Sequence, residues 1–366
     1  MQPNVMGFGA YFVAILAVRT ATQLTVYAEQ LQALNDYDQD HDRPQWHQLS
    51  ELKKAFVEEL REHKQALCAN LGLTDLIKCH VQQSRFSQLE SRILWNNVVN
   101  QNSTVALRFY PESLMEQRDF IRMRTGYIKR PIAERIPFTR TPVAKRVAER
   151  YLNFAELGLV TPVKNQRQCG ACYSFTAMSV LESALLRRFG STPNFSEQQG
   201  IDCTFGRYEN ETMNLGCDGG HPYYVLRHAE KARYVSSAVY GYRNRQQPCK
   251  VLEEPQPLWL TAGVVAADGT NEGLIEILHK FGPVSVAVAV GNSEFKHYGG
   301  GIITQCGPKL DHAVVLVGYR VSGDPEGSYW IVKNSWGPDW GENGFARIRM
   351  GICGVTQEDP VVVIVH

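Results

Sequence analysis

The sequence has no charge excess, no internal repeats and no long low-complexity tracts. Its 366 residues contain 38 Lys and Arg against 37 Asp and Glu, a formal net charge of +1. A chain so close to neutral gives no support to nucleic-acid binding, and we expect no nucleic-acid partner. With 44% hydrophobic residues, it is long enough for one or two packed domains and an additional segment.

Long apolar runs are also missing, apart from one near the N-terminus. Residues 5–18 are uncharged and mostly apolar, but this run is too short to span a bilayer comfortably, and Arg19 follows it. Small residues at positions 20–22 offer a cleavage point, although no basic side chain precedes the run. We expect residues 1–22 to be a signal peptide and expect no membrane span. A disordered or buried N-terminal segment is the alternative.

Cysteine is present, but a second closely spaced pair is not. The nine cysteines include Cys169 and Cys172, which form a Cys-x-x-Cys motif. Such a motif can be half of a zinc site or a redox pair. However, the next two cysteines, Cys203 and Cys217, are 14 residues apart, and no βαβ pattern surrounds the motif. From this motif alone, a catalytic thiol and a metal or redox pair both remain open.

The residues around Cys172 suit a nucleophile. Apolar residues recur every three or four positions from Ser174 to Phe189, and Gly190 follows, which predicts a helix that starts near Cys172. A thiol at a helix N-terminus lies in positive potential, which lowers its pKa toward the reactive thiolate. Gln166, six residues upstream, could donate an amide hydrogen bond to a developing oxyanion.

A cysteine nucleophile needs a general base and a group that orients the base. His312 heads an apolar, β-branched run that predicts a buried strand, and Asn334 follows another strand-like run. His312 and Asn334 lie 140 and 162 residues after Cys172. A lone histidine beside an apolar run is more often a satisfied core residue. The joint occurrence of cysteine, glutamine, histidine and asparagine favours a catalytic set.

Over roughly residues 150–366, the chain resembles the papain-like cysteine proteases of the cathepsin group. The motifs occur in family order: Gln166-Arg167-Gln168-Cys169-Gly170-Ala171-Cys172-Tyr173, Ser196-Glu197-Gln198, Gly216-Cys217-Asp218-Gly219-Gly220, Asp311-His312-Ala313-Val314 and Asn334-Ser335-Trp336-Gly337. The resemblance implies an α+β, papain-like fold of two halves over residues 148–366. A helical half would cover about 157–258 and a β-barrel half about 259–360, with a substrate cleft between them.

The resemblance also implies a role for each site residue. Cys172 would be the nucleophile, and His312 would hold it as a thiolate–imidazolium pair and later protonate the leaving amine. Asn334 would orient the imidazole, and Trp336 would cover the contact between them. Gln166 and the backbone N–H of Cys172 would form the oxyanion hole. No metal and no cofactor are expected.

Two further features of the sequence bear on the expected activity. Tyr173 stands where most relatives carry tryptophan, and we expect altered packing without loss of function. No histidine-bearing insertion follows Gly220 of the kind that blocks the cleft in exopeptidase relatives, so we expect an endopeptidase.

Substrate-binding residues are implied as well. Glu358 would lie at the floor of the pocket for the second residue upstream of the scissile bond (P2), where its carboxylate could pair with a basic side chain. We therefore expect arginine to be tolerated at P2 beside bulky apolar residues. The alternative is a solvated carboxylate, because residues 357–359 form a polar run. The other expected binding residues are Gly220, Pro222, Ala287, Leu310, Ala313 and Trp336.

The implied disulfide bonds indicate an oxidising compartment, and we expect a lysosomal or secreted protein. Cys68 and Cys79 are left over and could pair with each other. Sequons at Asn102, Asn194 and Asn210 are compatible with N-glycosylation. The pairs that the resemblance implies are Cys169 with Cys217, Cys203 with Cys249, and Cys306 with Cys353.

Residues 23–147 are expected to form a mostly helical propeptide. Apolar residues at helical spacing between Trp46 and Leu60 predict one helix, and residues 86–99 predict a second. The resemblance implies that an extended stretch then runs backwards through the cleft, and residues 108–112 with those following are the candidate. We expect maturation near Lys145, Arg146 and Arg150. The family's interspersed helix motif does not fit, so a helical accessory domain unrelated to inhibition is the alternative.

The expected partners are peptide or protein substrates, the chain's own propeptide and protein inhibitors of the cystatin type. We expect a monomer. Two other functions stay open: a catalytically silent binding protein on the same fold, and a zinc or redox protein built on Cys169 and Cys172.

Overall fold

The computed structural model describes residues 46–67, 76–100, 103–132, 135–138, 150–208, 211–212, 214–250, 259–291 and 293–366. The expected signal peptide, Cys68, the side chain of Cys79, the sequons at Asn102 and Asn210, and the maturation residues Lys145 and Arg146 lie outside the described residues. The fold below is that of the unit Leu49–His366. Its described residues 49–138 are called the N-terminal segment.

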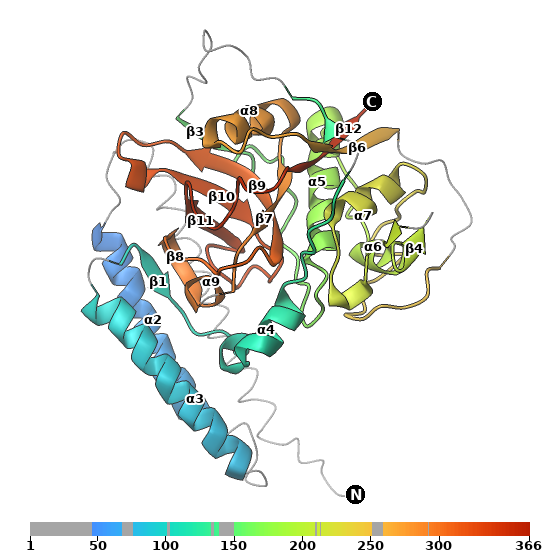
Figure 1. Ribbon diagram of the computed structural model, residues 1–366. Helices are drawn as coiled ribbons and strands as arrows, with labels where there is room; N and C mark the ends of the chain where they lie inside the picture. The colour runs from blue at the N-terminus through green and yellow to red at the C-terminus, as the bar shows by residue number, and fades with distance from the viewer. Residues whose placement is uncertain are drawn as a thin grey trace, which may run out of the picture. The chain divides into compact units, whose positions relative to one another are not determined.

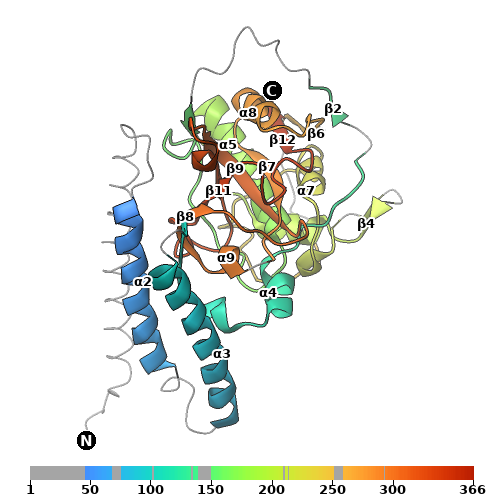
Figure 2. The ribbon, with the colours of Figure 1, turned by 60° about the vertical axis from the view of Figure 1, so that its left-hand side comes forward.

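The N-terminal segment begins with two helices that lie side by side, α2 (Trp46–Ala66) and α3 (Leu76–Leu94) (Figures 1 and 2). Both predicted helices are present, but α3 starts ten residues before the expected position 86 and ends in a π-helical turn, Trp95–Val99. In that turn, Asn97 Nδ2 donates to the carbonyl of Leu107 at 2.8 Å. A side-chain amide therefore ties the end of the helix to the strand that follows.

One sheet of ten strands forms the centre of the unit, with the order β1-β8-β11-β10-β9-β7-β12-β6-β2, and β3 also pairs with β9. The strands are β1 (Val105–Leu107), β2 (Arg135–Ile136), β3 (Tyr151–Asn153), β6 (Leu260–Val265), β7 (Val284–Val288), β8 (Tyr298–Ile303), β9 (His312–Arg320), β10 (Tyr329–Lys333), β11 (Phe345–Arg349) and β12 (Val361–Val365). A separate hairpin pairs β4 (Arg207–Tyr208) with β5 (Glu211–Thr212).

The predicted strands at β9 and β10 and the α+β class are confirmed, but among the described strands the sheet is not closed into the expected barrel. The sheet is open, and its two ends are β1 and β2. Both belong to the N-terminal segment, so this segment covers the outer hydrogen-bonding edges of β8 and β6.

Two hydrophobic cores lie on opposite faces of the sheet. Along β9, Val314 and Leu316 belong to one core and Val315 and Val317 to the other, as expected from the two-residue period of a strand. The second core is closed by α5 (Cys172–Phe189), which contacts β7, β9 and β12. Figure 1 shows α5 beside the sheet. The helix ends at Gly190, where φ is 71°, as the sequence predicts.

Shorter helices complete the fold. They are α4 (Gln117–Arg124), α6 (Glu197–Cys203), α7 (Pro222–Ala229), α8 (Asn271–Phe281) and α9 (Ser293–Lys296). Side-chain caps start three of them: Ser196 Oγ accepts the Gln199 N–H at 3.0 Å, His221 Nδ1 accepts the Tyr223 N–H at 3.2 Å, and Thr270 Oγ1 accepts the Gly273 N–H at 3.0 Å. Among the described helices, none is both long and apolar enough to cross a bilayer.

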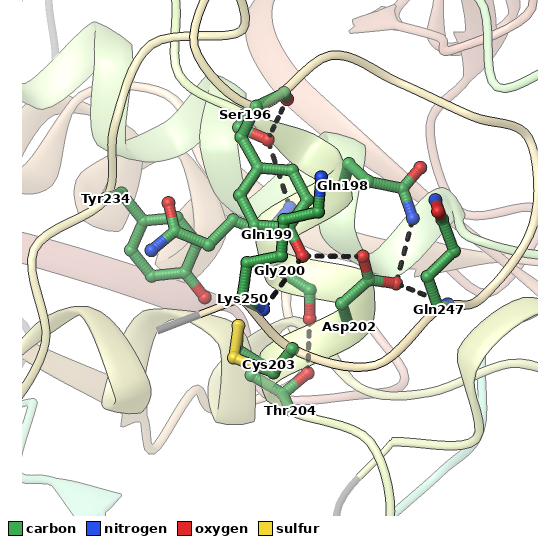
Figure 3. The surroundings of a disulfide bond; sticks show 12 residues. Ser196, Gln198, Gln199, Gly200, Asp202, Cys203, Thr204, Tyr234, Gln247 and Lys250 are labelled. Carbon is green, nitrogen blue, oxygen red and sulfur yellow. Dashed lines mark hydrogen bonds between the residues drawn. A yellow bond between two sulfur atoms is a disulfide. The ribbon is translucent and has the colours of Figure 1, made fainter. Parts of the chain in front are cut away.

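The three implied disulfides are present: Cys169–Cys217, Cys203–Cys249 and Cys306–Cys353. Beside the second, the Asp202 carboxylate accepts hydrogen bonds from Gln198 and the Gln247 N–H, each at 2.8 Å (Figure 3). It also accepts one from the Tyr240 hydroxyl at 2.8 Å. These bonds and the disulfide hold a stretch without regular structure against α6. Because Cys169 is bonded to Cys217, it does not form a metal or redox pair with Cys172.

Candidate active site

Cys172 is the first residue of α5 and is fully buried. Among the described cysteines it alone is not in a disulfide. Its sulfur accepts a hydrogen bond from the backbone N–H of Ala313 at 3.4 Å. The residue that precedes Ala313 is His312, so the start of β9 brings the predicted base beside the predicted nucleophile.

His312 and Asn334 form a direct hydrogen bond. The imidazole Nε2 donates to Asn334 Oδ1 at 2.7 Å, since an amide oxygen can only accept. The Ser335 N–H donates to the same oxygen at 2.8 Å, which fixes the orientation of the amide. His312 starts β9 and Asn334 directly follows β10, its antiparallel neighbour, so strand pairing makes the contact. Nδ1 of His312 is buried without a hydrogen-bond partner in the structure.

Trp336 lies over the imidazole of His312, with ring centroids 4.9 Å apart and planes inclined by 35°. The rings of Phe120 and Phe295 meet the indole edge-on at 5.2 and 5.7 Å. The indole therefore shields the bond between His312 and Asn334 from water.

Gln166 is held rigidly at the same site. Its Oε1 accepts from Ser335 Oγ at 2.6 Å, and its Nε2 donates to the carbonyl of Cys169 at 2.9 Å. Nε2 also approaches the carbonyl oxygen of Thr125 at 3.5 Å. A carbonyl oxygen of the N-terminal segment thus already lies where the predicted oxyanion donor points.

The N-terminal segment passes through this site as extended backbone. The N–H groups of Gly126 and Tyr127 both donate to the carbonyl of Asp311 at 2.9 Å. The N–H of Ile128 donates to the carbonyl of Gly220 at 2.9 Å, and the Gly220 N–H donates back to Gly126 at 2.8 Å. The bridge between Tyr127 and Gly220 is parallel. Residues 126–128 therefore lie between Asp311, next to His312, on one side and Gly220 on the other.

Of the expected stretch, residues 108–112 lie outside the site, and only residues that follow them, 126–128, lie within it. The Arg108 N–H bonds the carbonyl of His297, and Tyr110 bonds the Gly341 N–H at 2.9 Å, so this stretch lies against β8 and the residues before β11. The segment in the site follows α4 instead. The sequence did not single out Gly126, where a Cβ would lie 2.0 Å from the carbonyl oxygen of Gly170. Only glycine permits so close an approach.

Arg124 is a second residue that the sequence did not reveal. It is buried at the end of α4, and its guanidinium lies 5.6 Å from the Trp336 ring. It donates to the carbonyl of Arg167 at 3.0 Å and pairs with Glu112 at 3.3 Å. The Trp336 indole N–H in turn donates to the Arg124 carbonyl at 2.7 Å. The N-terminal segment thus also covers the tryptophan side of the site.

Burial controls the protonation of the site. It raises the pKa of Cys172 to about 12 and lowers the pKa of His312 to about 4. Both groups are therefore neutral here at pH 7, and the predicted lowering of the thiol pKa is wrong for this covered form. The loss of water around the sulfur outweighs the potential of the α5 N-terminus.

The predicted pocket residues are placed as follows. Ala287 and Ala313 are direct partners in β7 and β9, and Pro222 is the buried first residue of α7. Leu310 adjoins Gly354, where an added Cβ would lie 2.5 Å from its Cδ2.

Glu358 forms an ion pair with Lys129 of the N-terminal segment at 2.5 Å, and its side chain is 19% exposed. The Tyr127 ring lies 5.4 Å from that of His221, the residue before Pro222. Burial first, then the charge of Glu358, raise the pKa of Tyr127, so its phenol lies near that carboxylate.

Tyr173 is fully buried, and its hydroxyl donates to the carbonyl of Gly216 at 2.9 Å. The polar tip of the phenol therefore has a partner, as a buried tyrosine requires. Asn194, the one predicted glycosylation site among the described residues, is exposed. Its glycosylation stays a prediction.

Comparison with known proteins agrees with this geometry. Residues 149–363 match the model of the papain family cysteine proteases. The chain belongs to this family. It is 36% identical to human cathepsin L2 over 213 residues, which cover 56% of this chain and 62% of that protein. It is 35% identical to papain from Carica papaya over 212 residues, 56% of this chain and 58% of that protein.

The chain spans less than two thirds of the length of these curated relatives. Its fold matches a longer stretch of one solved structure, a recombinant stem bromelain precursor. That match has a TM-score of 0.70 at 27% identity and covers 85% of this chain and 99% of the other. The similarity therefore includes residues of the N-terminal segment as well as the papain-family domain.

Proposed function

We propose that the chain is the precursor of a cysteine endopeptidase and that residues 23–147 are its inhibitory propeptide. One observation carries the proposal: the backbone of residues 126–128 is hydrogen-bonded between Asp311, which directly precedes His312, and Gly220. A polypeptide already fits the site in extended form, and the thiol beneath it is neutral and shielded. Both features support a latent peptidase.

The chemistry follows once the propeptide leaves and water enters. The Cys172 thiol passes its proton to Nδ1 of His312, and the thiolate attacks the substrate carbonyl carbon. A C–S bond forms, and the carbonyl electron pair moves to oxygen, where Gln166 Nε2–H and the Cys172 N–H stabilise the charge. Collapse breaks the C–N bond, and His312 gives its proton to the leaving amine. Asn334 holds the imidazole throughout.

Water completes the cycle. It attacks the thioester carbonyl while His312 takes one of its protons, and the C–S bond then breaks to release a carboxylic acid. The proton on His312 returns to the sulfur, which restores the starting state. Every proton and electron pair is accounted for by the substrate, water and these residues, so no cofactor is required.

Labelling tests the proposal. The chain is acidified to release the propeptide, and turnover of a fluorogenic dipeptidyl substrate is measured before and after treatment with an epoxide or vinyl sulfone thiol trap. We expect turnover that the trap abolishes and covalent labelling that is lost in Cys172→Ala. A propeptide-free protein that neither turns over substrate nor takes the label would instead be a catalytically silent binding protein.

For substrate selectivity, we propose that Glu358 favours a basic side chain at P2. The ion pair with Lys129 supports this, because the carboxylate already binds a cation of the propeptide beside the site. Arg-Arg and Phe-Arg substrates are compared in wild type and Glu358→Ala, with Asp359→Asn as the adjacent-carboxylate control. We expect the Arg/Phe ratio of kcat/KM to fall about tenfold in Glu358→Ala alone. An unchanged ratio would exclude the role.

We further propose that the protein acts in the lysosome or outside the cell as a monomer, with cystatin-type proteins among its inhibitors. Three disulfides support an oxidising compartment. Fractionation of the producing cells, with the disulfide state measured in each fraction, tests the location.

A further inference from the structure

Beyond the cleft, the N-terminal segment reaches the far edge of the sheet. Strand β2 pairs there with β6 in parallel, Arg135 opposite Val264 and Ile136 opposite Val265. The Ala266 N–H donates to the carbonyl of Ile136 at 3.1 Å. Because β6 is the next strand inward, departure of β2 would leave the outer backbone groups of β6 without strand partners.

Gly263 forms a slot for one side chain at this edge. An added Cβ would lie 2.3 Å from Cδ1 and 2.6 Å from Cγ1 of Ile136, and the third-nearest atom, at 3.9 Å, is also from Ile136. The backbone of Gly263 does not have a positive φ, so its conformation does not require glycine. The missing side chain is explained by the isoleucine that fills its space.

A carboxylate lies beside the slot. Asp359 Oδ2 pairs with Arg135 at 2.8 Å, and its Oδ1 accepts the Ala267 N–H at 3.0 Å. The carboxylate side chain is 17% exposed, whereas that of Arg135 is 55% exposed. The preceding residue, Glu358, holds Lys129 beside the cleft. Adjacent carboxylates therefore hold two basic residues of the N-terminal segment, one at the cleft and one at the sheet edge.

We propose that the β6 edge, Gly263 and Asp359 form a second docking site, outside the catalytic cleft, for an extended segment in which a basic residue precedes a β-branched aliphatic one. Its ligand is the chain's own propeptide, which this edge site retains after the linker of residues 139–149 has been cut. The inhibitory effect of retention rests on the proposed function, whereas the retention itself does not.

Two sites on one short segment act together. Residues 126–128 bind the cleft and residues 135–136 bind the edge site, and a cut within 139–149 removes neither contact. While one contact holds, the other rebinds as an intramolecular event at high effective concentration. The cut propeptide therefore leaves slowly, and weakening the edge site speeds its departure without any change in the cleft.

Retention can be measured on the full chain. A recognition sequence for an unrelated protease is placed within 139–149 and cut at neutral pH. Co-elution of the two fragments on gel filtration and turnover of a Phe-Arg substrate are then followed over time. We expect wild type to stay associated and nearly inactive, and Gly263→Ala to release its propeptide about tenfold faster. The matched control is Gly323→Ala, where an added Cβ meets nothing within 4 Å.

A complementary change separates docking from general damage. Ile136→Ala empties the slot, so it should also speed release about tenfold. In the double variant the new methyl group of Gly263→Ala meets no isoleucine, and release should match that of Ile136→Ala alone. Equal release from wild type and Gly263→Ala, or multiplied effects in the double variant, would overturn the proposal.

The proposed function is tested separately in the same samples. After acid removal of the propeptide, Gly263→Ala should have the kcat/KM of wild type, because Gly263 lies outside the cleft. If all stripped samples are inactive, the endopeptidase proposal fails, while co-elution still reports on the edge site.

Discussion

We expect His297 to make propeptide binding sensitive to acid. His297 directly precedes β8 and is buried beneath the N-terminal segment, where its Nδ1 lies 3.0 Å from Ser113 Oγ. Burial first, then the positive charges of Lys296 and Arg92, lower the pKa of His297 from its ordinary 6.5 to about 3. The bound state therefore holds a neutral imidazole. When the segment leaves, the ring loses the cover of Ser113 and meets water.

The direction and the size of the pH effect on propeptide binding follow from the difference in the pKa of His297 between the bound and the released state. Above pH 6.5 the imidazole is neutral in both states, and binding is at full strength. Below pH 6.5 only the released state takes up the proton, so each pH unit weakens binding by about 1.4 kcal/mol until the pKa near 3 is reached. At pH 4.5 the effect amounts to at most about 2.7 kcal/mol, up to roughly a 100-fold faster or more complete release, because the charge of Lys296 stays beside the ring.

His297→Asn tests this directly, because an amide keeps a polar atom near the position of Nδ1 but does not titrate between pH 4.5 and 6.5. Release of the cut propeptide is measured by gel filtration at both pH values. The ratio of propeptide release at pH 4.5 to release at pH 6.5 should be up to about 100-fold smaller in the variant than in wild type. Some pH dependence of release remains because of His221, since burial and the charge of Arg130 also lower the pKa of that residue, to about 3.

The control is His366→Asn, whose ring contacts Thr261 of β6. The same pH ratio in His297→Asn as in wild type would refute the reasoning, because the buried imidazole would then carry no acid sensitivity.

Other substitutions test the site itself. Gln166→Ala should lower kcat about 10²–10³-fold with little change in KM, by loss of an oxyanion donor, and steady-state kinetics on the stripped enzyme checks this. Asn334→Ala should cost about 10²-fold in kcat/KM because the imidazole loses its orientation, with the circular dichroism spectrum unchanged. Tyr173→Phe leaves the buried Gly216 carbonyl without its phenol donor and should lower stability by about 1–3 kcal/mol in urea titration. Arg124→Ala should raise turnover by the uncut chain about tenfold, because Trp336 loses its cover.

Much of the fold could be predicted where local chemistry is strong. The apolar period between residues 174 and 189 and the glycine after it predicted α5 to within two residues at its start. The apolar runs headed by His312 and ending before Asn334 predicted β9 and β10. The sequence could not decide whether the sheet closes into a barrel. Alternation of apolar and polar residues along a strand indicates which face of the strand is buried, but not which other strand pairs with it.

The candidate site divides in the same way. Motif spacing named Cys172, His312, Asn334 and Gln166, and the structure places these residues around one point. Motif spacing did not reveal Gly126, because the role of this glycine depends on its close approach to the distant Gly170 carbonyl.

The sequence by itself determined the family, the candidate catalytic set and the disulfide pairs that the resemblance implies, because these are carried by residue types in a fixed order. Only the tertiary structure decided which stretch lies over the thiol, which strands end the sheet and which way the pKa of Cys172 moves. Those properties depend on backbone groups far apart in the chain and on the exclusion of water between them, and no local pattern encodes either one.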